Sequence, residues 1–181
     1  MLHPLRHLRV VSHHRHLVLV CCIKAGIPLR GILHDLSKFS PAEFISGMRY
    51  YQGDRSPNDR EREIVGYSRA WLHHKGRNRH HFEYWYDVNP KSRRYEPVEM
   101  PIRFAAEMFC DRLAASKTYR GNAYTDREPL EYFLAVRARD RMHPETERLL
   151  EGWLKLLAAE GEDTAFAEVR RTVHDSKNRK G

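Results

Sequence analysis

The sequence has few cysteines, no long apolar run and no strand-like alternation. Its longest uninterrupted apolar run, residues 17–23, is seven residues long, far short of the roughly 18 residues that a membrane-spanning helix needs. No small-residue cleavage site of the kind that ends a signal peptide lies near this run. We therefore expect a cytoplasmic protein without a membrane partner.

The three cysteines, Cys21, Cys22 and Cys110, do not indicate a disulfide framework. Their number is odd and their spacing matches no disulfide-rich scaffold. Cys21 and Cys22 lie inside the apolar run, so we expect them to be reduced core residues. A useful length of alternating apolar and polar residues is also lacking, which argues against β-strands and leaves helices as the expected elements.

The remaining composition is that of one globular domain. The chain has 181 residues, 41% of them apolar and 31% charged, which is enough for one compact core but short for two. The formal net charge is +8. Such an excess of positive charge favours anionic partners such as nucleotides, phosphate esters or nucleic acid, although a solvated basic surface has the same composition.

Helix signals cover most of the chain, and we predict an all-α bundle of about seven to nine helices. Gly26 with Pro28 is a typical helix stop, and Ser40 with Glu43 matches a capping box at a helix start. The predicted helices cover about residues 5–25, 28–38, 41–51, 59–74, 80–86, 101–118, 125–136, 144–160 and 163–174, with an extended surface loop over residues 87–101. We expect one helical metal-binding domain over residues 1–175 and a frayed basic tail over residues 176–181.

Histidines and carboxylates gather in four clusters along this pattern. Imidazole and carboxylate groups together are the ligands that Zn, Mn, Fe and similar divalent metals take. The clusters are His13, His14 and His16; His34, Asp35 and Lys38; His73, His74, His80 and His81; and the pair Glu107 and Asp111. We expect one ligand among the three histidines of the first cluster.

The adjacent pair His34 and Asp35 is the most informative of these features. Neighbours on a helix point about 100° apart, so the two side chains do not face each other across a turn. They can still bind one ion between them, or the carboxylate can bridge two ions. Leu33 and Leu36 flank the pair, which indicates the inner end of a helix. Taken alone, the dipeptide is equally well explained by ordinary core or surface residues.

The later clusters are expected to point at the same place. His74 ends one predicted helix while His80 and His81 begin the next, so the corner between them directs both ends at one point. Glu107 lies one helical turn before Asp111 on a helix with an apolar face, so both can face one cavity. The four clusters together, in this order along the chain, favour a metal site more strongly than any single cluster does.

These residues resemble the HD-domain superfamily of metal-dependent phosphohydrolases. That family is named for a His, a His-Asp pair and a later Asp that hold a metal inside a helical bundle, and its expanded form adds further histidines. The resemblance implies a single-domain HD-domain-like bundle with the metal ligands His14, His34, Asp35, His74, His80, His81 and Asp111. Residues 24–28, 34–44, 70–85 and 100–111 look more closely like an uncharacterised bacterial and phage-associated family of HD-like pattern.

The stretch from His34 to Lys38 is similar to the His-Asp-x-x-Lys of cyclic-nucleotide phosphodiesterases, which implies catalytic roles for Asp35 and Lys38. The glycine-tyrosine-proline motif of the cyclic-di-GMP enzymes is absent after His81, so that specificity is not implied. The expected activity is hydrolysis of an anionic small molecule, for example a nucleotide or another phosphate ester. It would depend on one or two ions of Mn, Fe, Zn, Co or Ni, with Mg as a further candidate.

Two other functions fit the same sequence. A subset of HD proteins activates oxygen at a dinuclear iron site, which the histidine-rich ligand set permits. The alternation of basic and aromatic residues over residues 77–95 instead favours a non-enzymatic nucleic-acid binder. Substrate, metal identity and oligomeric state stay open, since the leucine-rich helix over residues 144–159 suits a core or an interface.

Overall fold

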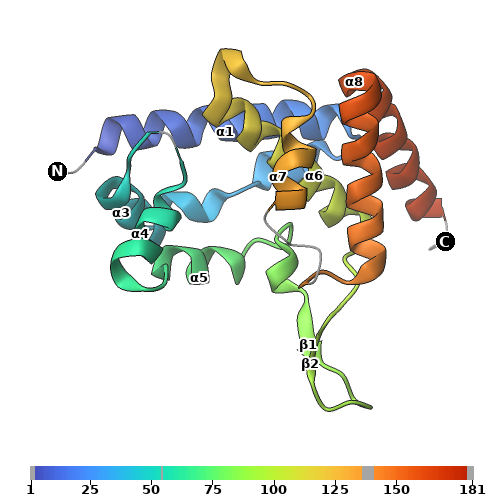
Figure 1. Ribbon diagram of the computed structural model, residues 1–181, viewed down its shortest axis with the longest axis horizontal. Coiled ribbons are helices and arrows are strands. Elements are labelled where there is room, and N and C mark those ends of the chain that lie inside the picture. Colours follow the sequence, from blue (N-terminus) through green and yellow to red (C-terminus); the bar gives the residue numbers. More distant parts are fainter. Residues whose placement is uncertain (1–2, 54, 136–140, 179–181) are drawn as a thin grey trace.

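The computed structural model describes residues 3–53, 55–135 and 141–178, and it confirms the all-α prediction (Figure 1). The helices are α1 (Pro4–Lys24), α2 (Pro28–Leu33), α3 (Pro41–Tyr50), α4 (Pro57–Val65), α5 (Arg69–Lys75), α6 (Ile102–Arg120), α7 (Glu128–Ala135) and α8 (Pro144–Asn178). Short 3-10 turns are η1 (Leu36–Phe39), η2 (Phe82–Tyr84) and η3 (Gly121–Ala123), and two strands are β1 (Tyr86–Val88) and β2 (Tyr95–Pro97). Within the described residues, no helix combines the length and apolarity that crossing a membrane requires.

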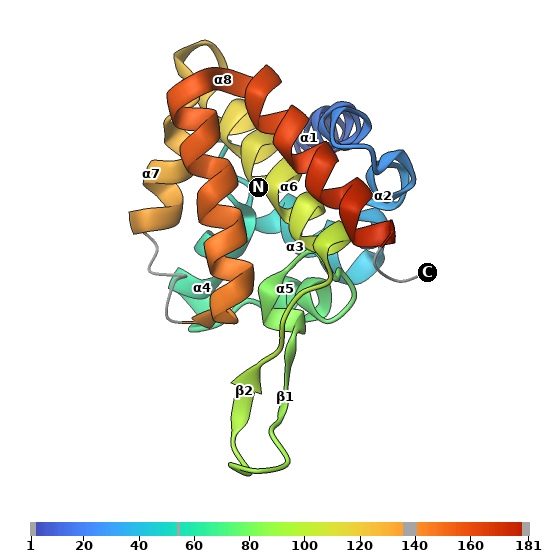
Figure 2. The ribbon, with the colours of Figure 1, turned by 90° about the vertical axis from the view of Figure 1, so that its right-hand side faces the viewer.

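Helix α6 is the centre of the core. Every residue from Phe104 to Cys110 is buried, and α1 and α8 pack along its sides (Figure 2). The Phe109 ring lies 6.0 Å from the Trp153 ring and 5.6 Å from the Phe166 ring, so aromatic contacts join α6 to both halves of α8. The metal-ligand candidates of α6 are therefore carried by the most buried helix of the bundle.

Helix α8 bends sharply at Gly161, where φ is 82° and ψ is −179°. The predicted end of a helix at this glycine is thereby confirmed, because the chain leaves the helical conformation there and starts again. The segment after the bend returns along the core and buries Phe166, Val169 and Val173. The predicted frayed tail is wrong for residues 176–178, which are helical, and residues 179–181 lie outside the described part.

Three predicted helices differ from the structure. The helix over residues 28–38 ends at Leu33, because Asp35 takes a left-handed conformation with φ 52°. The helix over residues 59–74 is divided in two by Gly66, whose φ is 85°. The segment 80–86 contains the turn η2, with His80 and His81 before it and the first residue of β1 at its end. Val136, the last apolar residue of the predicted helix after Thr125, lies outside the described residues.

The predicted surface loop over residues 87–101 contains a small antiparallel hairpin. Its register pairs Tyr86 with Pro97, Asp87 with Glu96, and Val88 with Tyr95. The expectation that the chain has no strands is therefore wrong at this one place. Three residues per strand are too few for an alternating pattern to be recognised in the sequence.

Candidate metal centre

All seven predicted metal ligands lie together in the middle of the molecule. His14 comes from α1, His74 from α5 and Asp111 from α6, while the other four lie in turns: His34, Asp35, His80 and His81. Their ligand atoms form three overlapping groups, within each of which the atoms lie no more than 4.8 Å apart. Four separate regions of the sequence are thus folded onto one point, as the order of the clusters predicted.

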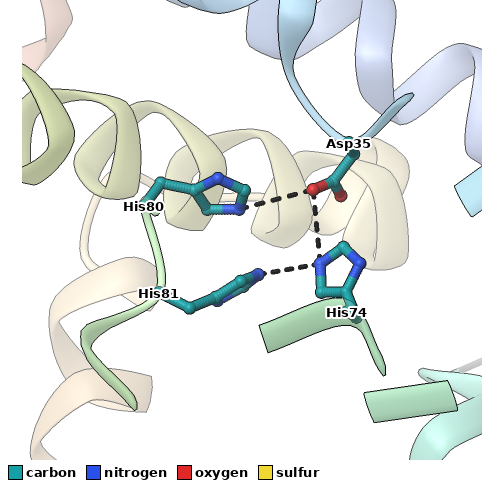
Figure 3. Close-up of side chains that lie close together, drawn as sticks. All are labelled: Asp35, His74, His80 and His81. Carbon is teal, nitrogen blue, oxygen red and sulfur yellow. Dashed lines mark hydrogen bonds and ion pairs between the residues drawn. The ribbon is translucent and has the colours of Figure 1, made fainter. Parts of the chain in front are cut away.

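The buried carboxylate of Asp35 is the centre of this arrangement (Figure 3). Its Oδ1 atom lies 3.2 Å from Nε2 of His74 and 3.4 Å from Nε2 of His80. Its Oδ2 atom lies 3.4 Å from Nε2 of His34 and 2.8 Å from Nζ of Lys38. One oxygen of the carboxylate therefore faces two imidazoles, and the other faces a third imidazole and the ammonium group of Lys38.

The backbone turn at His34 and Asp35 makes this possible. The left-handed conformation of Asp35 is one that aspartate adopts more readily than most residues, and it turns two adjacent side chains into the same centre. Arg15 of α1 holds the turn by donating from Nε to the carbonyl of His34 at 2.8 Å and from Nη2 to that of Ile32 at 3.0 Å. The expected apolar contacts of the flanking leucines are wrong, because Leu33 and Leu36 are exposed.

Two groups of ligand atoms share Asp35. One contains His14, His34 and Asp35, and the other contains Asp35, His74, His80 and His81. Nε2 of His74 lies 2.8 Å from Nε2 of His81, as Figure 3 shows.

Asp111 closes the first group from the α6 side. Its Oδ1 atom lies 3.0 Å from Nε2 of His14 and 3.6 Å from Nε2 of His34. Its other oxygen, Oδ2, lies 3.9 Å from Nε2 of His80. Asp111 thus lies near both groups.

Two further carboxylates lie behind the imidazoles. Oε2 of Glu43 is 2.7 Å from Nδ1 of His74. Oε1 of Glu107 is 3.1 Å from Nδ1 of His34 and 3.3 Å from Nδ1 of His80. At His34 and His74, a carboxylate hydrogen-bonded to Nδ1 holds the proton there and leaves the Nε2 lone pair for a metal, which is the usual arrangement behind metal-binding histidines. Nδ1 of His80 forms no such hydrogen bond among the described residues.

Glu43 is the site residue that sequence reasoning missed. The capping-box assignment is wrong, because the Ser40 side chain makes no capping hydrogen bond. Glu43 instead contacts His74 and, with its other oxygen, Nδ1 of His73 at 2.7 Å. Glu107 was expected to share a cavity with Asp111, and it lies behind the imidazoles rather than among the atoms that face one another.

Several buried atoms at the centre have no hydrogen-bond partner among the described residues. They are Nε2 of His14, His34 and His80, and Oδ1 of Asp35. A buried polar atom without a partner costs about 1–3 kcal/mol, and native proteins contain few of them. Their convergence, together with the nitrogen and oxygen donor set, fits a bound divalent cation.

The electrostatics keep the carboxylates of this centre ionised. Burial works against the charge of Asp35, yet His34 and Lys38 hold the pKa of its carboxyl well below the usual range. Burial likewise opposes the charge of Asp111, and the neighbouring imidazoles of His14 and His34 lower its pKa strongly. Both aspartates are therefore available as anionic ligands at neutral pH.

The histidines differ in their affinity for protons. Burial disfavours the charged form of His74, but Asp35 and Glu43 raise its pKa to about 9. Burial and the nearby His80 hold the pKa of His81 well below its usual range. His81 is therefore a neutral donor near pH 7, while a metal would have to displace a proton from His74.

The remaining histidines of the clusters lie away from the ligand atoms. His13 and His16 are exposed on the outer face of α1, whereas His14 is buried with Val11 and Val18 on the inner face. His73 contacts Glu43 only from outside the centre. The structure thus places His14, rather than its two neighbours, at the site.

The family profile of DUF5662 matches residues 3–156. The chain belongs to DUF5662, a family of unknown function. The matched segment contains all seven ligand candidates and both outer glutamates, and it ends before the bend of α8. Comparisons with curated proteins and with solved structures found no match.

Proposed function

We propose that this protein is a metal-dependent hydrolase of phosphate esters or nucleotide-like anions. The observation that carries the proposal is the Asp35 carboxylate, which is 1% exposed. Its Oδ1 atom faces the imidazoles of His74 and His80, and its Oδ2 atom faces that of His34. Such a carboxylate suits a bridge between two cations. The HD-like order of the ligands in the sequence supports the same assignment.

The ligands divide between two ion positions that share Asp35. His14 and His34, with Asp111 at 3.0 and 3.6 Å from their Nε2 atoms, would hold one cation. His74, His80 and His81 would hold the other. A divalent cation bound there lowers the pKa of a coordinated water and neutralises charge on a phosphoryl group. Imidazole and carboxylate donors accept Mn, Fe, Zn, Co and Ni, and Mg less readily.

Lys38 is the cation of the chain best placed to assist at the phosphate. Its ammonium group lies 2.8 Å from Oδ2 of Asp35, and its side chain is 30% exposed. Burial opposes its charge, but Asp35 and Asp111 raise its pKa above the usual value. Lys38 therefore stays protonated at neutral pH and can stabilise negative charge beside the metal position.

Arg112 is a second candidate for contacting an anionic substrate. It follows Asp111 on α6, its guanidinium lies 5.5 Å from the centroid of the Phe133 ring, and its Nε has no hydrogen-bond partner among the described residues. A phosphate oxygen is a suitable acceptor for such a donor. We assign it to substrate binding and not to metal binding.

Metal analysis of the untagged protein and of Asp35→Asn tests the proposal. We expect one to two divalent ions per wild-type chain, loss of most of that metal in Asp35→Asn, and at least a hundredfold loss of hydrolysis. Asp163→Asn is the matched control, because Asp163 is an exposed aspartate on α8. Phosphomonoesters, phosphodiesters and nucleotides should be screened with each of the six metals.

Two results would contradict the proposal in different ways. A protein without metal, with Asp35→Asn equal to wild type, would remove the metal site itself. An iron-loaded protein that consumes oxygen but hydrolyses no phosphate would keep the site and replace the reaction with oxygen activation. The metal analysis and the activity screen therefore separate the site from its chemistry.

A further inference from the structure

The β1–β2 hairpin extends away from the helical body (Figure 1), and Figure 2 shows the same projection from the side. It connects η2 to α6 and contains none of the metal-ligand candidates. A two-stranded hairpin is marginally stable by itself in water. The hairpin therefore needs further contacts to stay ordered, and its exposed side chains are separate from the metal-ligand candidates.

Hydrogen bonds from side chains keep the tip of the hairpin ordered. The side-chain oxygen of Asn89 accepts from the backbone N–H of Lys91 at 2.9 Å and of Ser92 at 3.3 Å. Glu96 accepts from Asn89 and from Ser92, both at 2.6 Å. The carboxylate of Glu96 is thus engaged in holding the turn, and it forms no direct ion pair with a cation of the tip among the described residues.

The two faces of the hairpin differ in character. Val88 and Tyr95 are opposite each other in the register, so their side chains share one face, and they are 47% and 72% exposed. Asp87 and Glu96 occupy the other face. The first face therefore presents an uncovered aromatic ring beside the tip.

Positive charge lies at the tip. Lys91, Arg93 and Arg94 are all exposed, and among the described residues none of the three forms an ion pair with a carboxylate. Some exposed cations of the chain are paired, such as Arg148 with Glu145, and others, such as Arg6 and Arg9, are not paired within the described part of the chain. The tip differs in bringing three unpaired cations together within residues 91–94.

A second group of cations lies at the base of the hairpin, around the Phe104 ring. The guanidinium carbons of Arg30, Arg79 and Arg103 lie 4.7, 6.0 and 4.8 Å from its centroid. In the described part of the chain, only Arg30 of these three has a carboxylate partner, Glu107. Cation–π contact with one ring attracts each arginine, but it does not neutralise the charges of Arg79 and Arg103.

We propose that the hairpin and its base bind single-stranded nucleic acid. The base and tip cations would contact successive backbone phosphates, and the face with Val88 and Tyr95 would stack against unpaired bases. Three residues per strand span about 10 Å, so a single phosphate group cannot reach both groups of cations. A polyanion with regularly spaced charges and aromatic bases fits the distribution of positive charge and the exposed ring together.

Fluorescence anisotropy with a labelled single-stranded oligonucleotide of about 20 nucleotides tests this proposal on the full chain. The tip variant replaces Lys91, Arg93 and Arg94 with Gln, and the matched control replaces Arg148, Lys155 and Arg171 with Gln, three exposed cations of α8. We expect at least tenfold weaker binding for the tip variant, and a change below twofold for the control. The logarithm of the association constant should fall less steeply with the logarithm of salt concentration, with a slope smaller in magnitude by about 2, for the tip variant only.

Tyr95→Ala tests the stacking part, with an expected loss of about fivefold or more in single-strand affinity. Asp35→Asn, measured in the presence of a chelator, should bind the oligonucleotide as wild type does. This result makes the inference independent of the proposed hydrolase activity. Circular dichroism and thermal unfolding verify that each variant is folded.

Four results would overturn the inference. These are no measurable binding at low salt, equal losses in the tip and control variants, loss of binding in Asp35→Asn, and duplex affinity above single-strand affinity with no effect of Tyr95→Ala. Tighter binding to anionic lipid vesicles than to the oligonucleotide would assign the hairpin to a membrane surface instead. A change of oligomeric state in the tip variant without nucleic-acid binding would assign it to self-association.

Discussion

At the scale of single residues, the outer carboxylates decide how well the imidazoles are oriented. Glu43 accepts from Nδ1 of His74 and of His73, at 2.7 Å in each case, and is itself buried. We predict that Glu43→Gln lowers metal affinity by about 10- to 100-fold, because the neutral amide no longer holds the His74 proton on the Nδ1 side. Competition with a chromophoric chelator measures this affinity.

The matched control is Glu99→Gln, which removes the same charge from an exposed position and should leave the affinity unchanged. The metal stoichiometry at saturation should stay that of wild type, because Glu43 is not one of the atoms that face the centre. Wild-type affinity in Glu43→Gln would contradict the positioning role.

The titration of His74 predicts how metal binding depends on pH. Asp35 and Glu43 raise the pKa of His74 to about 9 against the effect of burial, so its proton must leave when a metal binds. We expect affinity to rise by about tenfold per pH unit between pH 6.5 and pH 9 and then to level off. Calorimetry in two buffers of different ionisation enthalpy should show about one proton released per chain at pH 7.5.

The stability of the metal-free protein depends on pH in the opposite direction to metal affinity. A pKa raised in the folded state means that the charged His74 stabilises the fold fully below about pH 6.5, and that this contribution is lost as pH rises through 9. Metal-free protein should therefore become less stable over the pH range in which metal affinity grows. A metal affinity that does not change with pH would exclude proton displacement from His74.

The sequence grouped the ligand candidates better than it identified the carboxylates behind them. The order of His14, His34, Asp35 and Asp111 follows a pattern that survives without structural information, and helical spacing with Val11 and Val18 separates His14 from its exposed neighbours. Glu43 could not be recognised as a contact of His74, because the local capping-box pattern is a sufficient explanation for a glutamate at this position. Its true partner, His74, is 31 residues away and becomes close only through tertiary packing.

At the scale of elements, close contact between α1 and α2 positions the turn at His34 and Asp35. A Cβ atom added at Gly31 would lie 2.8 Å from Cβ of Cys22 and 2.9 Å from Cα of Leu19. The second of these is a backbone atom, so α2 and the turn after it would have to move. We predict that Gly31→Ala lowers the free energy of unfolding by about 1–3 kcal/mol and weakens metal binding.

Gly152→Ala in α8 is the control for Gly31→Ala, because no atom lies within 4 Å of the added Cβ. That substitution should stabilise the protein by about 0.5–1 kcal/mol through helix propensity alone. Urea unfolding of both variants measures the difference. Equal stability of the two variants would contradict the close approach of α1 and α2.

Element boundaries were the least predictable part of the fold. The predicted helix over residues 28–38 has a good local pattern, but two adjacent side chains can face one centre only if the backbone turns at Asp35. His80 and His81 were similarly expected to begin a helix, whereas His81 is extended with ψ 128°. In both cases the contacts of the ligand centre override a weak local preference for helix.

At the scale of the whole molecule, the all-α class followed from composition and helix signals because those properties do not depend on boundaries. The segment of α8 after Gly161 is a different matter. It lies outside the part matched by DUF5662, yet it buries Phe166, Val169 and Val173 against the core. Glu162 at its start also forms ion pairs with Lys24 of α1 and Lys117 of α6.

This packing predicts that the segment after the bend is needed for a stable fold. Burying one large apolar side chain contributes about 1.5–3 kcal/mol, so the three buried residues Phe166, Val169 and Val173 contribute on the order of 5 kcal/mol together. That is comparable with the whole stability of an ordinary domain. We therefore expect a chain that ends at Glu160 to lose cooperative thermal unfolding, as followed by circular dichroism.

A chain that ends at Asp175 is the matched control, because the residues it lacks among those described, Ser176 to Asn178, include none that is buried. It should unfold within a few degrees of the full chain, since so little apolar surface is lost. Cooperative unfolding of the chain ending at Glu160, at the temperature of the full chain, would contradict this account. It would place the stabilising core entirely within the part that the family shares, and the segment after Gly161 would then be an addition to a domain already stable without it.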